Sequence, residues 1–194
     1  MSSNFKKRPP RQAGHKDKWG GAYFVTFNVF NARRDRIPKS EGPLGVLDGA
    51  GVRFSPRGQA LAEVWQELPV LFRTVEIGSF VIMPDHFHGI LSLRPADGNA
   101  NLSFKPLGQV IGALKSLSTK RMNEYFKSAG ASFWQSGFYD RAIRDATIHA
   151  RVERYIQNNP AVLRRRVIAY ARENGGGGLQ PATTIFPGAG RDKA

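Results

Sequence analysis

The order in which two hydrophobic periods alternate is the feature that most constrains the fold of this chain. Segments rich in aromatic and β-branched residues, typical of strands, lie at about residues 22–30, 74–83, 86–93 and 138–144. Apolar residues recur at helical spacing in two other segments, at about residues 56–72 and 106–127. The order is therefore strand, helix, strand, strand, helix, strand. This order predicts an α+β, ferredoxin-like split βαβ fold, in which helices cover one face of an antiparallel sheet.

Local sequence signals set the expected limits of these elements. Ser55 and Pro56 favour a helix start, and Pro84-Asp85 predicts a tight turn between two strands of a hairpin. Residues 31–54 are polar with scattered Gly and Pro, so we expect a loop with at most a short strand near Val52.

A third helix is expected after the last strand, with Asp145 as its cap. Pro160 disfavours helical geometry in the residue before it, so we expect this helix to end at about Asn158. A separate short basic helix, at about residues 161–172, is expected to follow. The C-terminal part of the chain thus adds helices to the split βαβ plan.

The two ends of the chain differ in composition from the rest. Residues 1–18 are basic and lack a hydrophobic period, which predicts a disordered arm, and residues 173–194 resemble a flexible Gly-rich tail. Between them, residues 19–172 are expected to form a single domain. No apolar run approaches the roughly 20 residues that a membrane helix needs, and the N-terminus lacks the apolar stretch of a secretory signal. With no cysteine in the sequence, we expect a cytoplasmic protein without membrane contact.

Positive charge is concentrated in particular parts of the chain. The formal net charge is +14, and residues 105–172 carry thirteen Lys and Arg against four Asp and Glu. Such a distribution favours nucleic acid over a merely solvated basic surface, and predicts association with the nucleoid. Candidate phosphate contacts on the last three predicted helices are Lys115, Lys120, Arg121, Arg151, Arg154 and Arg164 to Arg166.

His86 and His88 lie two residues apart on a predicted strand. Side chains alternate along a strand, so both imidazoles leave the same face and Phe87 leaves the other. Two imidazoles on one rigid strand can chelate a divalent ion. Two histidines with no ligand are the simpler interpretation, and a third group would have to complete the coordination shell.

One face of the predicted third helix carries Val152, Tyr155, Ile156 and Asn159, at i, i+3, i+4 and i+7. From spacing alone, the favoured interpretation is that Tyr155 is an ordinary amphipathic core residue and Asn159 an ordinary helix cap. A functional interpretation requires this face to lie against the histidine-bearing side of the sheet. In that arrangement the phenol and the amide oxygen would both approach the histidines.

Four blocks of the sequence resemble the REP-associated tyrosine transposases, a branch of the single-tyrosine HUH transposases. Pro84-Asp85-His86-Phe87-His88 resembles the HUH motif, and Gly20-Gly21-Ala22-Tyr23-Phe24-Val25-Thr26 resembles the opening strand of this branch. Residues 133–144, from Phe133-Trp134-Gln135 to Ile143-Arg144, are similar to its Trp-Gln and Ile-Arg block. Arg154-Tyr155-Ile156-Gln157-Asn158-Asn159-Pro160 is similar to its tyrosine helix. The blocks occur in the same order and spacing as in that branch.

The resemblance implies a role for each matching residue. Tyr155 would be the nucleophile that forms a 5′-phosphotyrosine link, and His86, His88 and Asn159 would hold Mg²⁺ or Mn²⁺. Related insertion-sequence enzymes have a glutamine where this chain has Asn159. Arg141 and Arg144 lie in a matched block and would contact DNA. The implied activity is that of a transposase that cleaves and rejoins single-stranded DNA, with palindromic hairpins as partners.

Other functions are compatible with the sequence. A relative that binds DNA hairpins without cleaving them would keep the fold, and a replication initiator or relaxase would share the chemistry. An RNA-binding ferredoxin-like domain would instead display strand aromatics such as Tyr23, Phe27 and Phe80. The resemblance leaves a monomer and a homodimer equally open.

Overall fold

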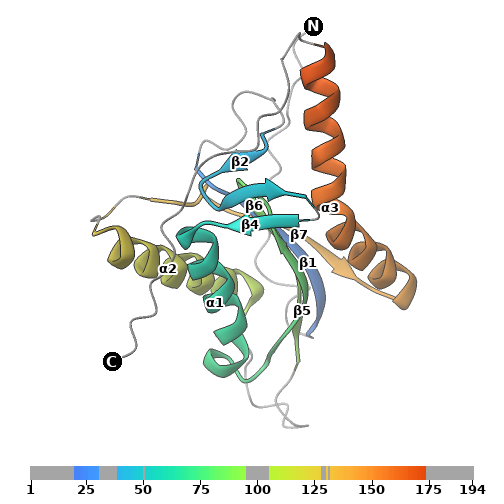
Figure 1. The fold of residues 1–194 in the computed structure, drawn as a ribbon. Helices are drawn as coiled ribbons and strands as arrows, with labels where there is room; N and C mark the ends of the chain where they lie inside the picture. The colour runs from blue at the N-terminus through green and yellow to red at the C-terminus, as the bar shows by residue number, and fades with distance from the viewer. Residues whose placement is uncertain are drawn as a thin grey trace, which may run out of the picture.

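Four antiparallel strands form the main sheet, in the order β5-β6-β1-β7 (Figure 1). The computed structural model describes residues 20–30, 39–49, 51–94, 105–127, 130 and 132–173; the predicted arm at 1–18, the loop at 95–104 and the tail beyond Glu173 lie outside the described residues. The elements of the main fold are β1 (Gly21–Asn28), α1 (Pro56–Leu71), β5 (Val75–Ile82), β6 (His86–Leu93), α2 (Leu107–Phe126), β7 (Tyr139–Ile143) and α3 (Ala146–Glu173). The predicted α+β class, the antiparallel sheet and the order of its elements along the chain are confirmed. No helix in these described ranges is long and apolar enough to cross a bilayer.

The two faces of the sheet are covered by different helices. Helices α1 and α2 pack together on one face, and α3 lies on the other (Figure 1). Alternation along β1 sends Tyr23, Val25 and Phe27 into the core under α1 and α2, where all three are buried. Tyr23 and Phe27 therefore do not form an exposed aromatic surface of the kind an RNA-binding sheet displays.

The face under α3 carries a smaller apolar cluster. Ile90 of β6 is buried there with Val152 and Ile156 of α3, and Phe24 of β1 packs against them. Val152 and Ile156 belong to the helix face predicted from the sequence. Because His86 and His88 share the parity of Ile90, they emerge on this same face.

A second, three-stranded sheet lies within the segment predicted as a loop. It consists of β2 (Glu41–Gly42), β3 (Gly45–Asp48) and β4 (Gly51–Phe54), paired antiparallel in the order β2-β3-β4. Val52 lies in β4 as expected, but the prediction of a loop over 41–54 was otherwise wrong; residues 31–38 lie outside the described part. The strands are too short for a period to be evident, and Leu44, fully buried between β2 and β3, connects them to the rest of the fold.

Helix α3 is also longer than expected. It runs without interruption through Pro160 to Glu173, so the predicted end near Asn158 and the separate helix at 161–172 were wrong. Proline removes one main-chain hydrogen bond, the bond to the carbonyl of Ile156, and strains the preceding turn. Contacts beyond it offset this cost: Val167 is buried, and Arg164 donates to the Gly49 carbonyl at 3.0 Å.

Candidate active site

His86 and His88 lie at the start of β6, directly after the Pro84–Asp85 turn. Their ring centroids are 4.7 Å apart, and both rings lie on the α3 side of the sheet. His88 is buried, with 4% of its surface exposed, whereas His86 is half-buried. The spacing of the two residues thus places the imidazoles side by side, as predicted from the alternation of the strand.

Each imidazole is held through its Nδ1 atom. The Thr26 hydroxyl lies 2.7 Å from Nδ1 of His88, its cross-strand neighbour, and the Asp85 carboxylate lies 2.6 Å from Nδ1 of His86. When Nδ1–H donates to these oxygens, Nε2 of each ring carries a lone pair suited to a metal ion. The sequence reasoning missed both partners. The adjacency of Asp85 to His86 was an available signal, but Thr26 is identified only by the strand register.

Tyr155 reaches the histidines from α3. Its Oη lies 3.5 Å from Nε2 of His88, and the two ring centroids are 5.3 Å apart. Phe24, which packs against the apolar cluster under α3, stacks on His88 and contacts the Tyr155 ring edge to face. The tyrosine side chain is 50% exposed, which leaves the phenol accessible to a large substrate.

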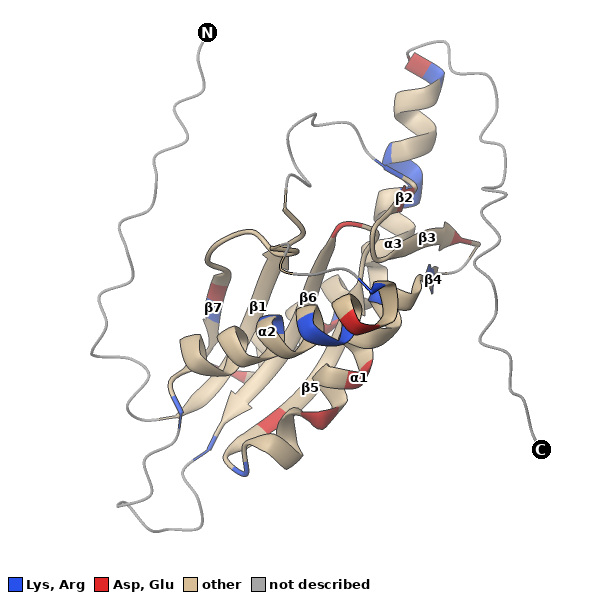
Figure 2. Cartoon of the chain, turned by 90° about the vertical axis from the view of Figure 1, so that its left-hand side faces the viewer, with Lys and Arg blue, Asp and Glu red and all other residues tan. Residues whose placement is uncertain are grey.

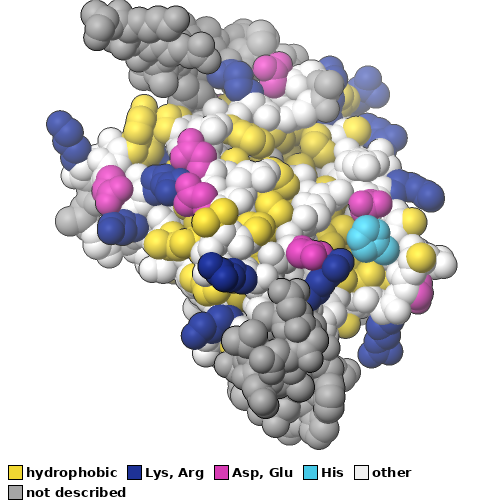
Figure 3. Space-filling view, turned by 90° about the horizontal axis from the view of Figure 1, so that it is seen from below, with side chains coloured by type: hydrophobic (Ala, Val, Ile, Leu, Met, Phe, Trp, Pro, Cys, Tyr) yellow, Lys and Arg dark blue, Asp and Glu magenta, His cyan; other side chains and the backbone are white. Residues whose placement is uncertain are grey.

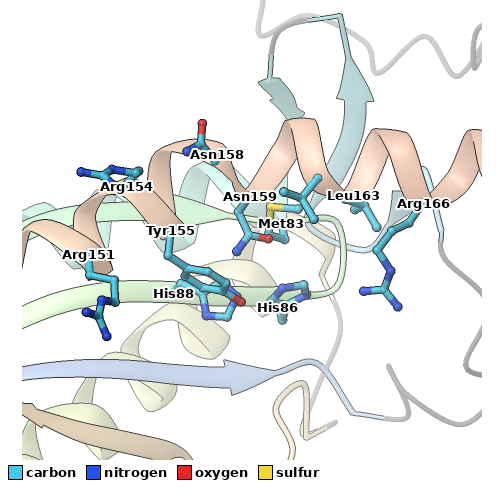
Figure 4. Close-up of a pocket in the computed structure, with 11 residues that line it drawn as sticks. Met83, His86, His88, Arg151, Arg154, Tyr155, Asn158, Asn159, Leu163 and Arg166 are labelled. Carbon is cyan, nitrogen blue, oxygen red and sulfur yellow. The ribbon is translucent and has the colours of Figure 1, made fainter. Parts of the chain in front are cut away.

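An open cleft of about 480 Å³ surrounds these groups (Figure 4). Its lining comes from β6, from the residue after β5 and from one side of α3, namely Met83, His86, His88, Arg151, Arg154, Tyr155, Asn158, Asn159, Val162, Leu163 and Arg166. The structure therefore brings together seven of the predicted site residues: both histidines, Tyr155, Asn159, Arg151, Arg154 and Arg166. Among the described residues, no group of three or more His, Cys, Asp or Glu side chains could hold a metal ion.

The predicted DNA contacts on α2 lie away from the cleft, because α2 covers the other face of the sheet. Lys115 is half-buried and donates to the carbonyls of Gln135, at 2.9 Å, and Gly137. Burial lowers the pKa of Lys115 from its ordinary 10.5 to about 8. Its role in this structure is to hold the loop before β7, and DNA contact by this residue stays a prediction.

The two other basic residues of α2 have acidic neighbours. Arg121 pairs with Glu67 and Glu63 of α1, and the hydrogen bond to Glu67 raises its pKa. Figure 2 shows basic positions on α2 and acidic positions on α1. Lys120 lies 4.0 Å from Glu124 on its own helix. Acidic side chains also lie among basic ones on the face shown in Figure 3. Local pairing of this kind reduces the field that these cations offer to a phosphate, and their DNA contacts remain predictions.

Arg141 and Arg144 lie near the edge strand of the sheet. Arg141 is exposed on β7 and pairs in register with Phe24, so it shares the sheet face that carries the histidines. Arg144 is exposed directly after β7. Neither lines the cleft, and both stay predicted contacts for DNA that extends beyond it.

Comparison with known proteins identifies the family. Residues 59–159, which span the histidines, Tyr155 and Asn159, match the family described as IS200-like transposase. A protein of Haemophilus influenzae described as uncharacterized is 28% identical over 152 residues, covering 72% of this chain and 80% of that protein.

Solved structures give a further likeness. A REP-associated tyrosine transposase bound to a REP hairpin has a TM-score of 0.52 at 18% identity, covering 93% of this chain and 98% of that one. A putative transposase from Deinococcus radiodurans has a TM-score of 0.44 at 18% identity, covering 75% of this chain and 95% of that one. The first likeness agrees with the resemblance found in the sequence blocks at the level of the fold. Since the family model matches more than half of the residues, the chain belongs to the IS200-like transposases.

Proposed function

We propose that this transposase binds single-stranded DNA that folds into hairpins, and that it cleaves and rejoins the strand through a phosphotyrosine on Tyr155. The supporting observation is the position of the phenol, 3.5 Å from the His88 imidazole and open to solvent in an arginine-lined cleft. Histidines and tyrosine come from one chain, so a single copy supplies all of these groups. The likeness to a transposase bound to a REP hairpin supports a hairpin as substrate.

The residues present fit a divalent metal ion. His86 and His88 offer imidazole nitrogens whose rings are oriented by Asp85 and Thr26, and Asn159 lines the same cleft with an amide oxygen to offer. A set of only three protein donors in an open cleft leaves room for water and phosphate oxygens, as Mg²⁺ or Mn²⁺ requires. When bound, such an ion supplies Lewis-acid stabilisation of the negative charge on the phosphate oxygens.

The protein side chains account for the rest of the reaction. The Tyr155 oxygen attacks phosphorus, so that a phosphorus–tyrosine bond forms while the bond to the 3′ oxygen breaks. The phenol loses its proton to solvent and the leaving 3′ oxygen takes one up, which conserves protons and charge. Arg151 and Arg154 border Tyr155 in the cleft and hold phosphates beside it. Because the phosphodiester bond is exchanged and not hydrolysed, a 3′-OH can reverse the step without ATP.

Trapping of the covalent adduct tests this proposal. Wild-type protein is incubated with a labelled single-stranded hairpin oligonucleotide and Mn²⁺, and the adduct is mapped by mass spectrometry of its peptides. Tyr155→Phe should abolish the adduct without weakening hairpin binding, since it removes only the phenolic oxygen. Tyr170→Phe, on the exposed side of the same helix, is the matched control and should behave as wild type. A metal-independent complex with no adduct would indicate a DNA-binding protein that does not cleave.

A further inference from the structure

Arg166 lines the cleft but has no part in the chemistry described so far. It belongs to a stripe of α3 that also contains Arg151, Tyr155, Asn159 and Val162, all of them lining the cleft. At about 1.5 Å per residue, Arg151 lies roughly 6 Å from Tyr155 along the helix axis, and Arg166 lies roughly 16 Å from it in the opposite direction. The two arginines therefore mark opposite ends of the cleft, with the histidines between them (Figure 4).

The direction of the tyrosine side chain distinguishes these two ends. Figure 4 shows the Tyr155 oxygen directed away from Arg151, toward His86, with Arg166 beyond. In a phosphoryl transfer the leaving oxygen lies roughly in line with the nucleophile, on the far side of phosphorus. A phosphate attacked by this oxygen consequently has its leaving 3′ oxygen on the Arg166 side.

The cleft wall at that end suits a bound phosphate. Met83, Val162 and Leu163 line this end of the cleft together with Arg166, whose exposed side chain is accessible to a phosphate from solvent. No acidic residue is among the described residues that line the cleft. A guanidinium in this position is well suited to bind phosphate through charge-assisted, bidentate hydrogen bonds.

We infer that Arg166 binds a backbone phosphate of the strand that is released with a 3′-OH, and so retains this strand in the cleft for rejoining. The inference rests on the proposed function, because it takes Tyr155 as the nucleophile. It assigns separate parts of the cleft to the two products: the Arg166 end to the 3′-OH strand, and the Arg151 end to the strand that stays linked to tyrosine. Loss of Arg166 should thus affect rejoining more than cleavage.

The test compares Arg166→Ala with Arg172→Ala, which removes the same charge from an exposed position of the same helix that does not line the cleft. A hairpin oligonucleotide carries one fluorophore at its 5′ end, which reports release of the 3′-OH strand by anisotropy, and a second at its 3′ end, which reports the covalent adduct on a denaturing gel. Rejoining is measured as the recovery of full-length oligonucleotide when preformed cleavage complexes are diluted into competitor DNA. Circular dichroism confirms that both variants fold, and Arg166→Lys tests whether positive charge partly restores retention.

Arg166→Ala should form the adduct at a rate within a few-fold of wild type, release the 3′-OH strand at least about tenfold faster and rejoin correspondingly less, as expected for loss of a charge-assisted contact. Arg172→Ala should match wild type in all three measurements. If wild type forms the adduct and the two alanine variants release the 3′-OH strand at equal rates, the inference is overturned but the proposed function is not. Failure of wild type to form any adduct overturns the proposed function, and the inference with it.

Discussion

Thr26→Val is the substitution that most directly tests how the histidines are held. Valine has nearly the shape of threonine and is well suited to a strand, but it cannot form the hydrogen bond to Nδ1 of His88. That nitrogen is buried with the rest of the ring, which is 4% exposed, and Thr26 itself is 8% exposed. Leaving a buried polar group unsatisfied costs about 1–3 kcal/mol. For a domain of this size, the melting temperature should fall by about 2–4 °C for each kcal/mol.

The same change should weaken metal binding by about 10–100-fold, the usual effect of removing the partner that orients a ligating histidine. Mn²⁺ affinity is measured without DNA by electron paramagnetic resonance, and adduct formation is followed over a Mn²⁺ titration. Adduct formation by Thr26→Val should recover at high Mn²⁺, whereas Thr26→Ser, which keeps the hydroxyl, should resemble wild type at every concentration. If Thr26→Val binds Mn²⁺ as tightly as wild type, the hydroxyl does not orient the ring and the reasoning fails.

Two further predictions concern the surroundings of the site. Burial lowers the pKa of Lys115 from 10.5 to about 8, so between these pH values the unfolded chain binds more protons at this position, and the contribution of Lys115 to the free energy of unfolding rises with pH. The free energy of unfolding of Lys115→Met, measured with urea, should therefore fall relative to that of wild type from pH 7 to pH 10. A difference that does not change with pH would contradict the lowered pKa. In Gly42→Ala, the added Cβ would lie 2.4 Å from the Pro84 carbonyl oxygen, so we expect a loss of about 1–3 kcal/mol in stability and weaker Mn²⁺ binding. Gly51→Ala, whose Cβ has no heavy atom within 4 Å, is its control; equal thermal unfolding and equal Mn²⁺ affinity in the two variants would show that contact with the turn is unimportant.

The sequence predicted the parts of this protein that depend on local periodicity. Alternation gave the four main strands and placed His86 and His88 on one face. Helical spacing placed Tyr155 on the same side of its helix as the residues that pack on the sheet. In each case a single element with a repeating pattern decides the outcome. The sequence could not show that this helix would lie against the histidine face, because that depends on packing between distant segments.

The predictions that failed depend on contacts outside the local sequence. Pro160 is an ordinary signal for a helix end, but contacts of the following residues with β4 and its neighbouring turn hold the helix together. The strands at 41–54 are defined by their pairing and by buried Leu44, neither of which has a period of its own. The basic residues of α2 were predicted as DNA contacts from charge alone, and these contacts stay predictions. Their pairing with α1 and with carbonyl groups becomes evident only from the arrangement of the helices.

The small sheet of β2, β3 and β4 connects the turn before β6 to the part of α3 that follows Pro160. At one end, the N–H of Leu44 donates to the carbonyl of Pro84 at 2.9 Å, in the turn that carries Asp85 and leads into His86. At the other end, Gly49 accepts from Arg164 on the part of α3 that follows Pro160. The proline removes a main-chain bond from the helix just beyond Tyr155, and the small sheet supplies an external connection across that position. A segment that contributes no side chain to the cleft therefore links the turn that orients one histidine to the helix that carries the nucleophile, and in this way it restricts the separation of the two halves of the site.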